Sequence, residues 1–487
     1  MASLKQKTIS GLSWSFAGSF AGQAIGFVIG IILARLLSPR EYGLIGMVTI
    51  FTILTQPFID SGFSQALIRK KECTQTEFST VFYFNILSGI IFYIIIYFSA
   101  PYISLFFNEP QLTSLTRVIG LIIIINSTSI IQTTILTRDL NFKLQTKIGL
   151  ISSVSSGVLG IILAFSGFGV WALVVRSLAE SFTKSIMLWL MNRWKPQMGF
   201  SLKVLKELFG FSSKLLASAI LDKIYYNIYN LVIAKYFSAR ELGLFTRAKM
   251  FKDSAAQTIS EIVGKVSFPV FASIQNEPQR LRDNYKQVLT STNYIIWISM
   301  FVLAAIAEPL VIALIGKQWI ESVIYLQLLS FVGVFYPTHV LTRNILMVYG
   351  KSGMLFRLEI FTKALAVPAI LIGVIWGIKF MILAMVFTGI VECLVKAYHS
   401  GKIVGYPILQ QLKDLSSTFF LAFTVGVILY LIAQSLSTSS YITLFIQLSI
   451  GIFFIIGFSE FFKLKEYLFI KEISITQVKG LMNRKKR

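Results

Sequence analysis

Apolar runs of about twenty residues recur from one end of the chain to the other, and no other feature limits its fold so strongly. A helix of that length crosses the hydrocarbon core of a lipid bilayer. Of the 487 residues, 55% are apolar and only 14% are charged. That is too little polar surface for a water-soluble protein of this size. The runs therefore predict an all-α integral membrane protein.

About fourteen transmembrane helices account for these runs. We expect them near residues 11–34, 42–66, 78–99, 114–136, 147–166, 169–191, 208–234, 242–272, 285–306, 320–346, 356–376, 378–399, 415–434 and 441–462. The first run follows a basic start and continues past twenty residues without a cleavage site, which indicates an uncleaved span. No polar segment between the runs is long enough for a separate soluble domain.

The basic residues are distributed unevenly between the two sets of connectors. With the N-terminus in the cytoplasm, the cytoplasmic segments hold 28 of the 45 Lys and Arg residues, and the opposite connectors hold six. Cytoplasmic loops of membrane proteins are enriched in basic residues, so this distribution predicts an N-in/C-in orientation. It also explains the net charge of +23 without a nucleic-acid partner.

One connector occurs twice. Ala34–Leu44 reads ARLLSPREYGL and Ala234–Leu244 reads AKYFSARELGL, with six of the eleven positions identical. Each copy joins the first two spans of a group of six, so the sequence predicts two parallel six-helix repeats followed by two C-terminal helices. We expect an N-terminal lobe (1–200), a C-terminal lobe (201–400), two additional helices (401–462) and a basic cytoplasmic tail (463–487). Parallel repeats of this kind place substrate between the halves, near mid-membrane.

Charged residues also occur within the spans. Eleven Lys or Arg and seven Asp or Glu lie there, although a charged group at the centre of a bilayer is costly. Helical phase gathers many of them, with neighbouring polar residues, into stripes on the second, sixth, seventh and eighth spans. Polar contacts between helices would produce similar stripes. A solvated cavity is the alternative that we pursue, because full charges make poor helix contacts.

This hypothesis selects the candidate site residues. Because the cations outnumber the acids, the cavity suits an anion, and Arg binds phosphate in a bidentate manner. The candidates for substrate binding are Arg247, Lys214, Lys265, Arg176, Lys252, Tyr225, Tyr229 and Gln56. Lys252 lies off the stripes, and we expect it to pair with Asp222, Asp253 or a neighbouring helix. The candidates for ion coupling are Asp60, Asp222 and Glu261.

Catalytic and metal-binding patterns are absent from the sequence. Cys73 and Cys393 are far apart, and His339 and His399 are isolated in the sequence, so no metal site is expected. YGKSG (Tyr349–Gly353) lacks the first glycine of a phosphate-binding loop. The connectors are too short to hold an extramembrane active site. We therefore expect neither an enzyme nor a cofactor.

Several stretches resemble the WzxC/TuaB-like polysaccharide exporters, which are Wzx-type flippases of the multidrug/oligosaccharidyl-lipid/polysaccharide superfamily. The first is LKQKTISGLSWSFAGSFAGQAIGFVIGIILARLLSPREYGLIGMVTIF, which starts at residue 4. The others are Asp60–Phe63 (DSGF), Leu136–Phe142 (LTRDLNF) and Gly167–Val174 (GFGVWALV). The resemblance extends well across residues 4–190 and fades in the last two spans.

The resemblance implies a flippase for an undecaprenyl-diphosphate-linked oligosaccharide, working by alternating access in the bacterial cytoplasmic membrane. It implies the lipid-linked glycan and the bilayer as partners, together with a polysaccharide polymerase and glycosyltransferases. Two alternatives stay open. One is an ion-coupled drug antiporter of the MATE type, and the other is a membrane enzyme, a polymerase or ligase, of polysaccharide assembly.

Overall fold

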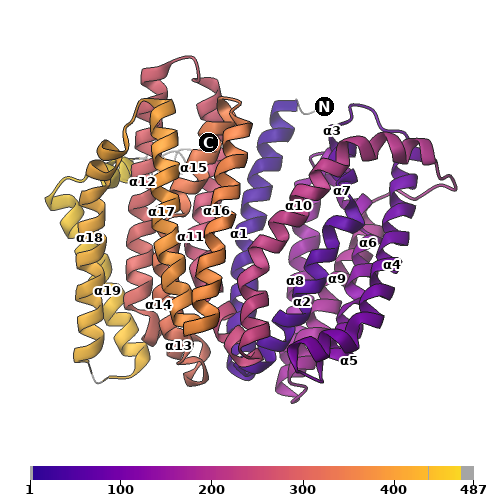
Figure 1. Ribbon diagram of the computed structural model, residues 1–487, viewed down its shortest axis with the longest axis horizontal. Helices are drawn as coiled ribbons and strands as arrows, with labels where there is room; N and C mark the ends of the chain where they lie inside the picture. Colours follow the sequence, from indigo (N-terminus) through magenta and orange to yellow (C-terminus); the bar gives the residue numbers. More distant parts are fainter. Residues whose placement is uncertain (1–3, 437, 473–487) are drawn as a thin grey trace, which may run out of the picture. The chain divides into compact units, whose positions relative to one another are not determined.

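The computed structural model describes residues 4–436 and 438–472, without the side chains of residues 4–13, 15–17, 19, 211, 214 and 215. All regular structure within these residues is helical (Figure 1). The chain forms two compact units, which we call unit 1 (Met1–Gly243) and unit 2 (Leu244–Arg487). Each is described by itself below.

Unit 1 is built on long helices with four shorter ones between them. Its helices are α1 (Leu4–Leu36), α2 (Pro39–Asp60), α3 (Phe63–Arg69), α4 (Gln75–Phe107), α5 (Leu112–Ile119), α6 (Leu121–Ser127), α7 (Ile130–Arg138), α8 (Phe142–Phe165), α9 (Val170–Met191) and α10 (Leu202–Tyr236). α8 packs between α1 and α9, and α10 packs along α2. Small residues allow this close packing. A Cβ atom at Gly157 of α8 would lie 2.1 Å from the Ile29 side chain of α1.

Unit 2 continues from α11 (Ala239–Ser273), whose first turn still belongs to unit 1. The following helices are α12 (Pro278–Ala305), α13 (Ala307–Ile315), the 3-10 turn η1 (Lys317–Trp319), α14 (Ser322–Gly333), α15 (Tyr336–Val348), α16 (Ser352–Trp376), α17 (Ile378–Val404), α18 (Ile408–Ser435) and α19 (Ser440–Phe461). The main pairs are α12 with α18 and α16 with α17.

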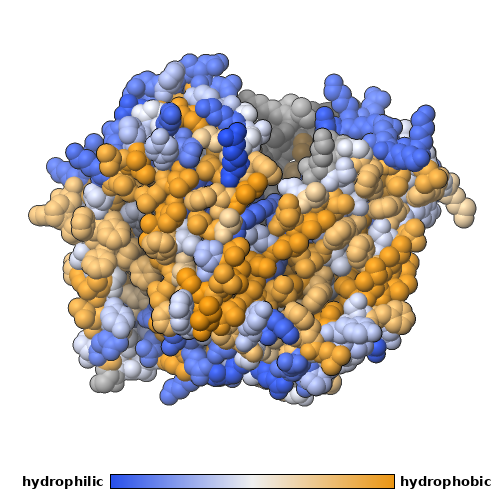
Figure 2. All heavy atoms as spheres, in the orientation of Figure 1, coloured by the Kyte–Doolittle hydropathy of each residue, from blue (hydrophilic) through white to orange (hydrophobic). Residues whose placement is uncertain are grey.

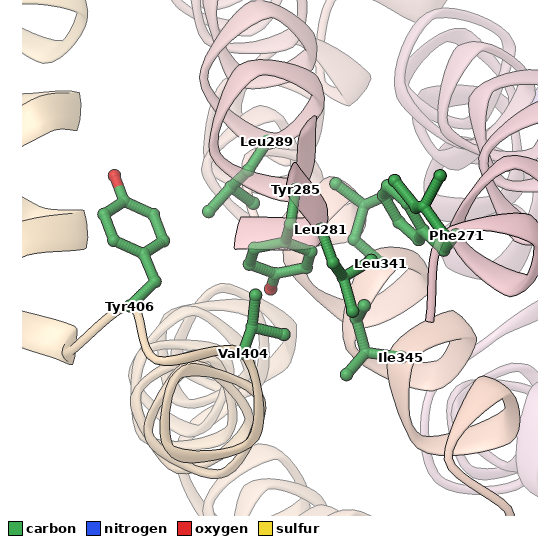
Figure 3. Close-up of a cluster of buried hydrophobic side chains, with 9 residues drawn as sticks. Phe271, Leu281, Tyr285, Leu289, Leu341, Ile345, Val404 and Tyr406 are labelled. Atoms are coloured by element: carbon green, nitrogen blue, oxygen red, sulfur yellow. The ribbon is translucent and has the colours of Figure 1, made fainter. Parts of the chain in front are cut away.

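A core of apolar and tyrosine side chains joins α11, α12, α15 and α17 of unit 2 (Figure 3). Tyr285 of α12 is fully buried, and its hydroxyl donates to Ser400 Oγ of α17 at 3.0 Å. Tyr406, in the α17–α18 connector, donates its hydroxyl to Asp414, which also pairs with Lys286 at 2.7 Å. Burial, followed by the bond to Asp414, raises the pKa of the Tyr406 hydroxyl, so it stays protonated and remains a donor.

All fourteen predicted spans coincide with helices or with broken helices. Within residues 4–436 and 438–472, nine helical segments are long and apolar enough to cross a membrane. A tenth arises if the bent pair Leu112–Ser127 and Ile130–Arg138 is one span. The other four predicted spans correspond to α1, α9, α10 and α11, which have 22 to 35 residues. Of these, α1 contributes the apolar segment Phe20–Leu36, and α9, α10 and α11 carry charged residues along their length. The all-helical membrane fold is confirmed, whereas the count of fourteen and the N-in/C-in orientation stay predictions.

The surface supports the membrane assignment. On the visible face of each unit, apolar residues cover the middle of the helices, and hydrophilic residues gather at their ends (Figure 2). Large apolar side chains are widely exposed, among them Phe98, Phe387 and Phe453. Contiguous apolar surface on this scale is unusual for a soluble monomer and is expected where lipid covers the protein.

The two copies of the repeated connector have the same local structure. In each, a serine begins the following helix, because the side chain of Ser38 or Ser238 accepts a hydrogen bond from the N–H of a glutamate three residues later. The copies also touch. A Cβ atom at Gly43 would lie 1.5 Å from the Ala239 carbonyl oxygen, and one at Gly243 would lie 1.8 Å from the Pro39 carbonyl oxygen.

This contact places α10 and the start of α11 in unit 1, so the unit boundary follows Gly243. The predicted lobes 1–200 and 201–400 follow the sequence repeat instead. The repeat organisation stays a prediction.

Candidate functional site

Unit 2 contains buried charged residues on α11 that contact α15. The Lys252 side chain is only 4% exposed and forms an ion pair with Asp253. Tyr336 of α15 completes the group, because its hydroxyl donates to Asp253 Oδ1 at 3.3 Å and its ring centroid lies 4.9 Å from Lys252 Nζ. Of the alternatives expected for Lys252, the structure shows the pair with Asp253 and a contact with Tyr336 on a neighbouring helix.

A second charged group lies one turn further along α15. His339 Nδ1 is 3.6 Å from Glu392 Oε1 of α17. The same oxygen accepts from Lys396 Nζ at 2.5 Å and from Thr362 Oγ1 of α16 at 2.9 Å. Lys396 is 6% exposed. Three helices thus share one carboxylate that is only 12% exposed. We call the residues Lys252, Asp253, Tyr336, His339, Glu392 and Lys396 the unit 2 network.

Sequence reasoning missed half of this network. It noted His339 only as isolated in the sequence and did not select Tyr336 or Lys396 as site residues, although α17 continues to Val404 and buries Lys396. The spacing held the missing signal. Tyr336 and His339 are three residues apart, and Glu392 and Lys396 are four apart, so each pair shares one face of a helix.

The predicted stripe on α11 is divided. Arg247 is buried, and its guanidinium lies 5.5 Å from the centroid of the Trp319 ring. Glu261 and Lys265 are exposed, and Glu261 accepts a hydrogen bond from Gln257 at 2.8 Å. About 21 Å of helix separates Arg247 from Glu261, at 1.5 Å per residue. The structure therefore does not bring Arg247 together with Glu261 and Lys265.

Unit 1 contains a polar groove of about 400 Å³ between α1, α8 and α9. Glycines open it, because a Cβ atom at Gly22 or Gly149 would meet nothing within 4 Å. Its polar lining comprises Gln145, Thr146 and Ser153 of α8 and Glu180 of α9. Arg176, one turn before Glu180, packs over Gly160 of α8 instead of lining the groove.

The remaining candidates lie on α2 and α10. Asp60 ends α2, and its Oδ1 accepts from the Ser64 N–H of α3 at 3.1 Å, so it stabilises the break between these helices. Gln56 lies one turn earlier and is half-buried. On α10, Asp222 is exposed, and Tyr225 and Tyr229 are half-buried. Lys214 is in α10, but its side chain lies outside those described.

Metal chemistry finds no support in the part of the chain that the structure describes. No group of three or more His, Cys, Asp or Glu side chains there is arranged to hold an ion. The geometry instead offers polar surfaces and buried charges inside bundles of apolar helices. Such intramembrane ionisable groups are typical of transport pathways and of coupling sites.

Comparison with known proteins decides the family. Residues 32–324 match the family model described as "Polysaccharide biosynthesis protein". The chain belongs to this polysaccharide biosynthesis family. The resemblance seen in the sequence is therefore confirmed.

Two curated relatives illustrate the family. The teichuronic acid biosynthesis protein TuaB of Bacillus subtilis is 24% identical over 358 residues, which is 73% of this chain and 74% of the relative. The lipopolysaccharide biosynthesis protein WzxC of Escherichia coli is 24% identical over 377 residues, which is 76% of each chain.

Solved structures share the fold. The lipid II flippase MurJ in an inward closed conformation matches with a TM-score of 0.73 at 16% identity, over 92% of this chain and 98% of that one. An inward-facing multidrug resistance MATE transporter matches with a TM-score of 0.63 at 16% identity, over 79% of this chain and 94% of that one. At this identity the likeness shows the fold alone.

Proposed function

We propose that this protein is a flippase that moves an undecaprenyl-diphosphate-linked oligosaccharide repeat unit from the cytoplasmic to the outer leaflet. The observation that carries the proposal is the family match across residues 32–324. It is supported by a relative named for transport, the succinoglycan biosynthesis transport protein ExoT of Rhizobium meliloti, which is 24% identical over 64% of each chain.

The physical task of such a protein agrees with the polar groups within each unit. A glycan and a diphosphate cannot cross hydrocarbon without polar partners, because each unpaired polar group costs several kcal/mol there. The polyprenyl tail needs no such path and stays in lipid. We assign substrate binding to Arg247, Lys214, Lys265, Arg176, Lys252, Tyr225, Tyr229 and Gln56, whose cations suit a diphosphate.

Transport by alternating access also needs a source of energy. We propose that Asp60, Asp222 and Glu261 take part in ion coupling, and that the Glu392 carboxylate of the unit 2 network is a further participant. The proposal places the protein in the bacterial cytoplasmic membrane, N-in/C-in with fourteen spans. A polysaccharide polymerase and glycosyltransferases would act with it.

Reconstituted vesicles test this function directly. Purified protein is inserted into liposomes that contain the lipid-linked repeat unit of its host, and an impermeant glycan-modifying enzyme reports which leaflet holds the substrate. We expect protein-dependent translocation of the intact repeat unit. Liposomes loaded with a cationic drug form the comparison, because the MATE transporters share the fold. Drug transport without glycan transport would contradict the proposal, and so would elongation of the glycan.

The buried residues of unit 2 offer matched variants for the same assay. Lys252→Met removes a buried cation of the network, whereas Lys402→Met removes an exposed one on α17. We expect the first change to reduce translocation at least tenfold and the second to leave it unchanged. Equal rates for both variants would remove Lys252 from the transport site without affecting the flippase assignment.

A further inference from the structure

Two sequence motifs to which the proposed function assigns no role lie together at one end of unit 1. The repeated connector supplies the start of α2, and Gly167–Trp171 joins α8 to α9. Together with the first turn of α5 they line a cavity of about 500 Å³, which we call the connector pocket. Helices α2, α5 and α9, which supply much of its lining, pack against one another. This volume lies within the range of small-molecule sites.

Two charged side chains of the connector, Arg40 and Glu41, are held at the wall of this pocket. The Glu41 carboxylate accepts from the Ser38 N–H at 2.6 Å and from the Ser38 hydroxyl at 2.8 Å. Arg40 pairs through Nη2 with Glu109 at 2.8 Å, while its side chain stays 56% exposed. A guanidinium has five N–H donors, so this pair leaves donors for a ligand. Arg40 and Glu41 thus do not pair with each other, although they are neighbours in the sequence.

The glycines of the α8–α9 loop bring the backbone against this wall. Gly167 and Gly169 have φ angles of 80° and 53°, a left-handed conformation that side chains disfavour. A Cβ atom at Gly169 would lie 2.5 Å from Glu41 Oε1. The loop can therefore approach the carboxylate only with glycine at this position. Trp171, two residues later, lines the same cavity.

We propose that the connector pocket binds a sugar residue of the transported head group, an inference that rests on the proposed function. Sugar hydroxyls both donate and accept, and the wall offers a guanidinium, the Glu41 carboxylate, the Gln111 amide and the Ser114 hydroxyl. Trp171 adds an aromatic ring, which suits the apolar face of a pyranose. The Glu41 carboxylate disfavours free phosphate here. In the proposed orientation the pocket opens on the outer side of the membrane, where it would receive the glycan after it crosses.

Binding of the free glycan tests the inference without transport. The probe is the repeat-unit oligosaccharide of the host, released from its lipid diphosphate by mild acid, and calorimetry on purified full-length protein measures its affinity. We expect Arg40→Ala and Gln111→Ala each to weaken binding about tenfold or more. Ser114→Phe fills the pocket from an exposed position without removing a buried contact, and it should abolish binding. The control is Arg240→Ala, the equivalent residue of the second connector.

The outcomes separate this inference from the proposed function. Weakened binding in the pocket variants with normal binding in Arg240→Ala supports the sugar site, as does a lack of competition by inorganic phosphate. Unchanged binding in Ser114→Phe, equal loss in Arg240→Ala, or displacement of the sugar by phosphate overturns it. If wild-type protein flips the lipid-linked glycan but does not bind the free one, the pocket inference fails alone. If it binds the glycan but does not flip, the proposed function fails.

Discussion

Lys396 is the residue of unit 2 whose replacement we expect to affect the stability of the helix bundle most clearly. It is a buried cation whose ion pair with Glu392 also engages His339 and Thr362. Removal of one partner from a buried pair leaves the other charge uncompensated, which typically costs about 3–5 kcal/mol. Replacement of both partners by apolar side chains removes that penalty. The network is therefore strongly coupled, and its residues do not contribute independently.

We predict that Lys396→Met lowers the unfolding temperature of the purified protein strongly, and that Glu392→Leu/Lys396→Met lowers it less. The reason is that the single variant leaves the largely buried Glu392 carboxylate without its lysine partner. Differential scanning fluorimetry in detergent measures both. Lys402→Met, exposed on the same helix, should change stability by no more than about 0.5 kcal/mol. A double variant as unstable as the sum of its single variants would contradict this coupling.

Among the structural elements, the broken helices explain what the sequence could and could not predict. The apolar run at 114–136 predicts one span, but the chain breaks it into α5, α6 and α7. Ser127, Thr128 and Ser129 each donate a side-chain hydrogen bond to the carbonyl three residues earlier. Such bonds compete with the helical ladder and bend it. Hydropathy averages over these hydroxyls, so it finds the apolar segment and misses the bend.

For the candidate site too, the sequence predicts some features and misses others. Charge found Lys252 and its acidic neighbour, because charged residues are unusual within an apolar run, although helical phase placed Lys252 off the polar stripe. Neither signal found that Arg247 packs on Trp319, since that contact joins α11 to η1, far along the sequence. Helical phase assigns residues to a face of one helix. The partner of that face depends on tertiary packing.

The close contact between the two connectors leads to a prediction about helix packing. We expect Gly43→Ala and Gly243→Ala each to destabilise the protein by about 1–3 kcal/mol, because the added methyl group meets a backbone carbonyl that cannot rotate away. Gly457→Ala in α19 is the matched control, since a Cβ atom there meets nothing within 4 Å. It should be neutral or slightly stabilising. Equal unfolding temperatures for the three variants would contradict the close approach of the connectors.

At the scale of the whole molecule, orientation is the property that the proposed transport direction depends on most. The distribution of Lys and Arg predicts that the connectors at Lys317 and Lys379 face outward and that those at Asn276 and Lys351 face the cytoplasm. All four residues are exposed, so cysteine can replace each of them without loss of a buried contact. Both native cysteines are free, which allows their replacement by serine as a background.

We predict that a membrane-impermeant maleimide labels Lys317→Cys and Lys379→Cys in intact cells, and labels Asn276→Cys and Lys351→Cys only after permeabilisation. The two sets control each other, because each should react fully in detergent. This pattern requires an odd number of crossings between Asn276 and Lys317 and between Lys351 and Lys379, which α12 and α16 provide. Labelling of all four positions from one side would contradict the span count. The reversed pattern would keep the spans but invert the direction of transport, and the connector pocket would then face the cytoplasmic donor of the glycan.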